Sequence, residues 1–225
     1  MAIDLKKKSI SLKKGEAISL KKPEIVGNDI VFSGAGFVGT LRVGLGWDPV
    51  REAVNTAGKG FFGKLFGGTS QTVKSGPDVD CDSFAIGLRD DGRYDNHVYF
   101  GNQKIYREAI CLLGDNLTGE GEGDDETILI DLSRVPVNRI VIGMNIYHAR
   151  SRGQSLGSLQ NAFIRLVDEK TGVEIAHYDI THNDGDALGL KFVELFKDSD
   201  GLWYCKTIDE TFNYESISEL VSSYK

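Results

Sequence analysis

Two short segments of this chain are crowded with carboxylates. Residues 115–126 read Asp-Asn-Leu-Thr-Gly-Glu-Gly-Glu-Gly-Asp-Asp-Glu, with six acidic residues and no basic one. Residues 78–82 read Asp-Val-Asp-Cys-Asp, and in an extended chain these three aspartates point to one side, each about 7 Å from the next. Crowded carboxylates repel one another unless a counter-charge compensates them. A hard cation supplies that charge, and Ca²⁺ accepts about six to eight oxygen ligands in irregular geometry.

Other interpretations of these carboxylates stay open. A solvated acidic loop is the simplest, and a glycosidase would use two carboxylates as acid and base. Nine acids in two segments exceed a catalytic pair, however, and 9% aromatic residues do not indicate a sugar cleft. Neither segment is an EF-hand, because position six is Ser83 when the loop starts at Asp78 and Glu120 when it starts at Asp115. We therefore favour a cation site built from both segments.

The net charge of −7 is a local property of the acidic segment. The chain of 225 residues has 33 acidic and 26 basic residues, and without residues 115–126 the acids fall to 27. A negative balance argues against a nucleic-acid-binding protein. The sequence contains no apolar run of transmembrane length, no secretory signal and no CxxC motif among its three cysteines. We therefore expect a cytoplasmic protein with reduced thiols.

The elements that must position these acids are mainly strands. Apolar and polar residues alternate over 37–47, which is typical of a half-buried strand. The same pattern predicts strands at 83–89, 97–100, 127–132, 139–147, 162–168, 174–180, 188–196 and 202–207. One helix is expected at the C-terminus, where an apolar stripe joins Ile217, Leu220, Val221 and Tyr224. The prediction is an all-β fold, an antiparallel β-sandwich with a C-terminal helix, forming a single domain over 1–225.

Two segments depart from this pattern. Residues 49–77 form an unusually long connection. Its Phe- and Lys-rich part at 58–66 either contacts a membrane or partner, or covers an edge of the sandwich. We favour the interpretation in which it covers an edge. The N-terminal residues carry a Leu-Lys-Lys repeat, which is compatible with a β-hairpin around Lys14-Gly15 or a basic arm.

Three motifs resemble the tellurium-resistance TerD family of bacterial stress proteins. They are Gly44-Leu45-Gly46-Trp47-Asp48, Asp78-Val79-Asp80 with Ser83-Phe84, and the stretch from Gly114 to Glu126. Residues 161–166, Asn-Ala-Phe-Ile-Arg-Leu, are also similar, and the resemblance runs from about residue 8 to the C-terminus. It implies a cytoplasmic, Ca²⁺-binding β-sandwich without enzymatic activity, linked to tellurite and chemical stress and acting with a membrane-embedded partner protein.

The resemblance also implies the ligands of the ion. The family's acidic motifs fall on Asp78, Asp80, Asp115, Asn116, Asp124, Asp125 and Glu126, with Glu120 and Asp48 as further candidates. Asp82 stands where the family usually has serine, so it adds a negative ligand. Cys81 lies inside this cluster, and we favour a buried structural thiol over a group that reacts with metalloids.

A second function is kept as an alternative. In it, the ion bridges the protein to an anionic membrane or another anionic ligand, and the basic N-terminus and residues 58–66 face the lipid. A hydrolase ranks third, because no acid–base pair stands out in the sequence.

Overall fold

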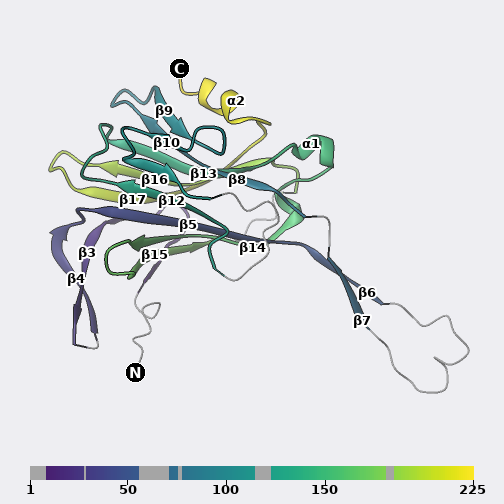
Figure 1. Cartoon of the computed structure of the whole chain (residues 1–225), viewed down its shortest axis with the longest axis horizontal. Coiled ribbons are helices and arrows are strands. Elements are labelled where there is room, and N and C mark those ends of the chain that lie inside the picture. The colour runs from purple at the N-terminus through teal and green to yellow at the C-terminus, as the bar shows by residue number, and fades with distance from the viewer. Residues whose placement is uncertain (1–8, 28, 56–70, 76–77, 115–122, 181–184) are drawn as a thin grey trace, which may run out of the picture.

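The computed structural model describes residues 9–27, 29–55, 71–75, 78–114, 123–180 and 185–225. Within these residues, two β-sheets pack face to face (Figure 1). The first sheet has seven strands in the spatial order β1 (Ile10–Ser11), β15 (Glu174–Asp179), β14 (Leu159–Asp168), β5 (Thr40–Pro49), β12 (Glu126–Asp131), β11 (Ile110–Leu112) and β10 (Lys104–Ile105).

The second sheet has six strands among the described residues. Their order is β2 (Ala17–Ser19), β17 (Trp203–Phe212), β16 (Gly189–Lys197), β13 (Arg139–Ile146), β8 (Cys81–Leu88) and β9 (Tyr94–Val98). The remaining elements are the ribbons β3 (Lys21–Val26) with β4 (Asp29–Gly36) and β6 (Arg51–Asn55) with β7 (Gln71–Ser75), the helices α1 (Ala149–Arg152) and α2 (Ile217–Ser222), and the 3₁₀ turn η1 (Leu156–Ser158).

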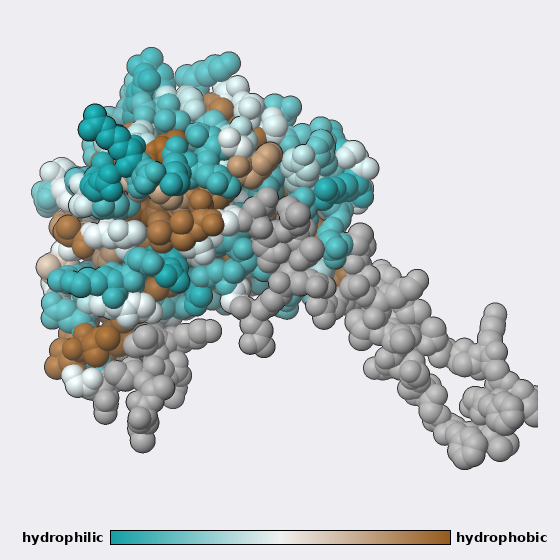
Figure 2. All heavy atoms as spheres, in the orientation of Figure 1, coloured by the Kyte–Doolittle hydropathy of each residue, from teal (hydrophilic) through white to brown (hydrophobic). Residues whose placement is uncertain are grey.

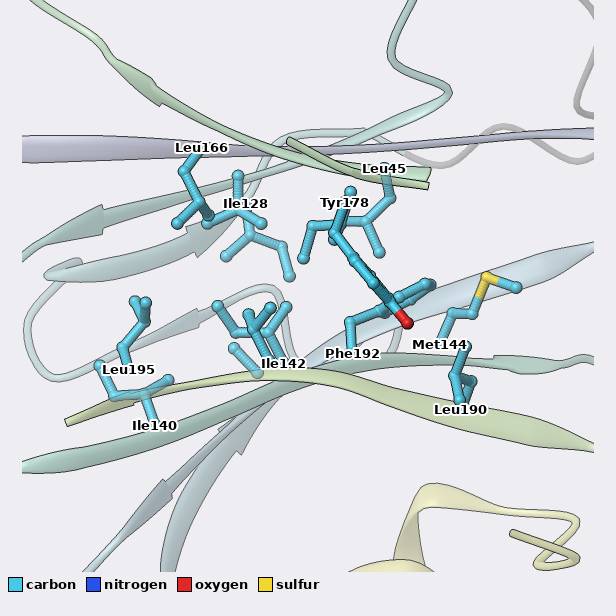
Figure 3. Close-up of a cluster of buried hydrophobic side chains, with 14 of the residues drawn as sticks. Leu45, Ile128, Ile140, Ile142, Met144, Leu166, Tyr178, Leu190, Phe192 and Leu195 are labelled. Carbon is cyan, nitrogen blue, oxygen red and sulfur yellow. The ribbon is translucent and has the colours of Figure 1, made fainter. Parts of the chain in front are cut away.

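The core lies between the two sheets. Figure 3 shows Leu45, Ile128 and Leu166 of the seven-stranded sheet meeting Ile140 and Ile142 of the other sheet. All five side chains are at most 2% exposed. Along β12 burial alternates strictly, because successive side chains of a strand point to opposite faces and only one face meets the core.

Strand β8 is buried on both faces. On its outer face, Phe84 and Ile86 pack under α2, which contributes Ile217 and Leu220 to the same cluster. Ser216 starts this helix by accepting a hydrogen bond from the Glu219 N–H at 3.2 Å. The predicted antiparallel β-sandwich with a C-terminal helix is therefore confirmed, with β1 and β15 forming a parallel exception.

The hairpin considered around Lys14-Gly15 is not formed. Strand β1 pairs with β15 in one sheet, whereas β2 pairs with β17 in the other. The turn between them is held by Thr207 of β17, which accepts from the Gly15 N–H and donates to the Glu16 carbonyl. The chain thus crosses from sheet to sheet because each short strand completes a different edge.

The connection at 49–77 contains regular structure. Residues 51–55 and 71–75 pair as the antiparallel ribbon β6–β7, which projects away from the sandwich (Figure 1). Residues 58–66, predicted either to cover a sheet edge or to contact a membrane or partner, lie outside the described residues.

The surface carries a small apolar patch on another ribbon. Figure 2 shows it at the lower left, where Figure 1 places β3 and β4, and the exposed residues there are Ile25, Val26 and Val31. Among the described residues, no helix has the length and apolar character needed to cross a membrane.

Candidate metal centre

Trp47, near the end of β5, contacts both acidic segments. Its backbone N–H donates to Asp125 Oδ2 at 2.8 Å, and its indole Nε1–H donates to the Val79 carbonyl at 3.1 Å. The side chain is only 2% exposed, so water does not compete for the indole bond. Residues 78–82 and 124–126, distant in the sequence, are therefore held against the same tryptophan.

Glu126 provides a second link between the segments. Its backbone pairs with Leu45 in the seven-stranded sheet, while its Oε2 accepts a hydrogen bond from the Ser83 N–H of β8 at 2.6 Å. Strand β8 pairs with β9 only from Ala85 onward, so the Ser83 N–H lies beyond that ladder. A buried carboxylate thereby satisfies a backbone donor and ties one sheet to the other.

Asp124 has an arginine as its partner. Arg165 of β14 donates from Nε and Nη2 to the two Asp124 oxygens at 2.6 and 2.9 Å, and its Nη1 lies 3.7 Å from Glu174. The Asp124 carboxylate passes over Gly44 of β5, where any Cβ atom would collide with it. The glycine at position 44 therefore makes room for a bidentate ion pair across β5.

Asp125 and Asp48 line a cavity of about 540 Å³. Asp48 Oδ2 accepts a hydrogen bond from the Asn161 side-chain amide at 2.8 Å, and Phe163 and His177 form part of the wall. The consecutive residues Asp124, Asp125 and Glu126 therefore occupy three environments: an arginine pair, a cavity and the interface between the sheets.

The three aspartates of residues 78–82 also separate. Asp78 is exposed, whereas Asp80 is buried with its Oδ2 3.3 Å from the Arg152 guanidinium of α1. Asp82 is buried too, but it lines a different and smaller cavity on the outer face of β8. Gln154 holds the segment in place by donating to the Asp78 carbonyl at 2.8 Å.

The donor set has the chemistry of a site for a hard cation. Its described members are oxygen donors, and the buried Ser83 Oγ and Gln154 Oε1 beside them have no hydrogen-bond partner within the described residues. Neutral oxygens of this kind complement carboxylates around Ca²⁺. Among the described residues, no three His, Cys, Asp or Glu side chains are arranged as a metal site. Three of the expected ligands lie outside those residues: Asp115, Asn116 and Glu120.

Cys81 lies between the carboxylates and is completely buried. Burial, followed by the charges of Glu126, Asp82 and Asp80, raises the pKa of its thiol well above the usual value. Because the thiolate is the reactive form, Cys81 is an inert structural thiol in the folded protein. This agrees with the sequence-based preference.

We expect one of the three thiols to react with Ellman's reagent in the native state. Cys81 and Cys205 are buried, and burial raises the pKa of Cys205 to about 12, whereas Cys111 is partly exposed. All three should react in denaturant, and Cys111→Ser should abolish the native reaction. Rapid native labelling of Cys81 in that variant would contradict the burial of this thiol.

His177 joins a charged network on the outer face of the seven-stranded sheet. Its ring stacks on Phe163 with the centroids 5.3 Å apart, Nε2 lies 2.7 Å from Asp179, and Nδ1 lies 3.6 Å from Glu174. The interaction with Glu174, reinforced by Asp179, raises the pKa of His177 despite its partial burial. Burial acts alone on His97 and lowers its pKa.

We expect ¹H–¹⁵N NMR titration to separate these two histidines. His177 should titrate above, and His97 below, the ordinary histidine pKa of about 6.5. The raised pKa means that His177 stabilises the fold below about pH 6.5 and loses this contribution as the pH rises through its folded-state pKa. Replacing His177 by Gln should therefore cost more stability in denaturant melts near pH 6 than near pH 8. Equal costs at both pH values would show that the charge on the ring is unimportant.

Several residues of this region are not among those that the sequence predicts for the site. Arg165 and Arg152 compensate Asp124 and Asp80, and Asn161 holds Asp48. Arg165 lies between the apolar residues Ile164 and Leu166 in an alternating strand. That pattern indicates an outward-facing side chain but does not identify its partner.

Comparison with known proteins places the chain in a family. The model of the TerD domain matches residues 8–224. Stress response protein SCP2 of Bacillus subtilis is 37% identical, covering 96% of this chain and 99% of its own length. Tellurium resistance protein TerZ of Serratia marcescens is 34% identical over 86% of each chain. The fold is shared with the crystal structure of a homologue of the telluride resistance protein from Streptomyces coelicolor, at a TM-score of 0.58 and 16% sequence identity. The match covers 82% of this chain and 96% of the Streptomyces chain.

Proposed function

This chain belongs to the TerD family of tellurium-resistance and stress proteins, and we propose that it acts as a non-enzymatic calcium-binding protein in the cytoplasm. The observation that carries the proposal is the position of Trp47, which binds Asp125 through its backbone and Val79 through its indole. This contact brings two acidic segments to one place, where their mutual repulsion favours a divalent cation.

Asp125 and Asp48, which line one cavity, are the candidate ligands that the described structure brings together, and the buried Glu126 and Asp80 have the right chemistry but do not complete a set of three with them. Asp115, Asn116 and Glu120 are candidates for the remaining ligands. Asp124 is a weaker candidate than the sequence suggests, because Arg165 already binds both of its carboxylate oxygens. The ion would supply positive charge, and Trp47 would hold Asp125 and the backbone at Val79 in place beside it.

Isothermal titration calorimetry tests this proposal directly. Protein stripped with EGTA and dialysed should give saturable heat with CaCl₂ and much weaker binding with MgCl₂, because Mg²⁺ demands near-octahedral geometry and gives up its water reluctantly. Failure to detect calcium binding by calorimetry or equilibrium dialysis would refute the proposal.

A second candidate function rests on the cavity beside Asp48 and Asp125. Its volume of about 540 Å³ leaves room for a ligand next to an ion bound by these residues. In this function, Ca²⁺ bridges the protein to an anionic membrane or another anionic ligand, and a membrane-embedded partner protein of the tellurium-resistance type would lie nearby. Calcium-dependent co-sedimentation with phosphatidylserine vesicles, absent with phosphatidylcholine vesicles, would support it. Equal sedimentation in EGTA would count against it.

A further inference from the structure

A smaller cavity, of about 190 Å³, opens on the outer face of the six-stranded sheet beside the start of α2. Its lining includes Asp82 and Asn145, which are cross-strand partners in β8 and β13 and are only 4% and 8% exposed. Cys81 and Ala85 belong to the core between the sheets, whereas Phe84 belongs to the cluster under α2. Since side chains alternate along a strand, this cavity lies on the face of β8 away from the core.

Aromatic rings from two turns form the walls of this cavity. Tyr99 and Phe100 follow β9, and Tyr147 and His148 follow β13. The Tyr99–Phe100, Phe100–Tyr147 and Tyr147–His148 ring centroids are 5.1, 5.7 and 4.2 Å apart, with interplanar angles of 75°, 85° and 79°. The four rings pack edge to face against one another and line the cavity, and aromatic rings are what sites for organic cations use.

Two acidic side chains, Asp82 and Glu215, lie on the lining of the cavity. Asp82 contributes a buried carboxylate, and Glu215 contributes a half-exposed one at the rim, where it pairs with Arg150 at 3.3 Å. Arg152, which pairs with Asp80, already lies over the Tyr147 ring, 5.4 Å from the centroid. The chain itself thus shows that this ring accepts a cation on its face.

We propose that this cavity binds a small alkylammonium ion. The ring faces attract the diffuse charge of an alkylated ammonium group, and the buried acidic side chain of Asp82 on the lining also favours a cation. A neutral apolar ligand would gain nothing from the acidic side chains of the lining, Asp82 and Glu215, whereas a cation is attracted by both.

The volume limits the size of the ligand. About 190 Å³ is below the roughly 300–1,000 Å³ that is typical of sites for drug-sized molecules. It suits a group as compact as tetramethylammonium, which we take as the probe.

The test is an NMR titration of protein with ¹³C-labelled Phe and Tyr rings, carried out in EGTA. Tetramethylammonium chloride should cause saturable shifts of the Phe100, Tyr99 and Tyr147 signals, beyond those caused by NaCl at equal ionic strength. Neopentyl alcohol, a neutral molecule of similar shape, serves as the comparison ligand. Absence of saturable shifts with the cation, or equal shifts with the alcohol, would overturn the proposal.

Variants sharpen this test. Phe100→Leu keeps an apolar side chain but removes a ring face, and we expect about fivefold weaker binding of the cation. The matched control is Phe196→Leu, since Phe196 stacks on Tyr204 outside the cavity and its replacement should leave binding unchanged. Asp82→Asn should also weaken binding, and Glu215→Gln, at the more exposed rim, provides a second charge variant if the first fails to fold. Because calcium is absent throughout, failure here leaves the calcium proposal untouched.

Discussion

Replacing Gly44 by Ala should destabilise the protein by about 3 kcal/mol, which corresponds to a melting temperature lower by roughly 6–12 °C. The added Cβ would collide with the Asp124 carboxylate, which lies over Gly44 on its way to Arg165. Asp124 and Arg165 are 8% and 23% exposed at their side chains, so separating them leaves two poorly solvated charges. The cost falls at the lower end of the range for buried pairs, because the Arg165 guanidinium keeps some contact with water. Differential scanning calorimetry measures the change.

Two controls show whether the ion pair causes this effect. Gly34→Ala makes the same substitution in β4, where no described atom beyond the chain neighbours lies within 4 Å of the new Cβ, and should change stability little. In the background of Asp124→Ala the collision disappears, so Gly44→Ala should then cost much less than in the wild type. Additive costs of the two substitutions would contradict the proposed role of Gly44.

Saturating Ca²⁺ should raise the melting temperature of the EGTA-stripped protein by about 5–10 °C. A ligand that binds only the folded state at about 100 times its dissociation constant stabilises it by roughly 2.7 kcal/mol, and each kcal/mol shifts the melting temperature of a chain of this size by about 2–4 °C. Much of this gain comes from removing the repulsion between the carboxylates of the two acidic segments.

The same melts with Asp125→Asn should show most of the calcium shift lost, because this residue links the acidic segment to Trp47. Asp179→Asn is the matched control: Asp179 lines the same cavity but interacts with His177 and lies in neither acidic segment. An unchanged calcium shift in Asp125→Asn, or an equal loss in Asp179→Asn, would remove Asp125 from the proposed ligands. Absence of any calcium shift in the wild type would contradict the calcium proposal itself.

Much of the fold could be predicted from the sequence because its signals are local. Alternation of apolar residues locates β12 at 126–131, where the sequence predicts 127–132, and the apolar stripe locates α2, whose cap in the structure is Ser216. The partners of β1 and β2 could not be predicted in this way. Each strand is only two or three residues long, and the edge that it joins depends on which strand elsewhere in the chain presents open hydrogen-bonding groups.

The sequence by itself determined how densely carboxylates lie in residues 78–82 and 115–126, and it predicts a cation site there without reference to any fold. The tertiary structure alone decided the surroundings of each carboxylate. Asp124 meets Arg165, Asp125 meets Trp47, and Asp82 lies in a separate aromatic cavity. The physical reason is that neighbouring side chains of an extended chain point in different directions, so their partners come from strands whose register is set by long-range pairing.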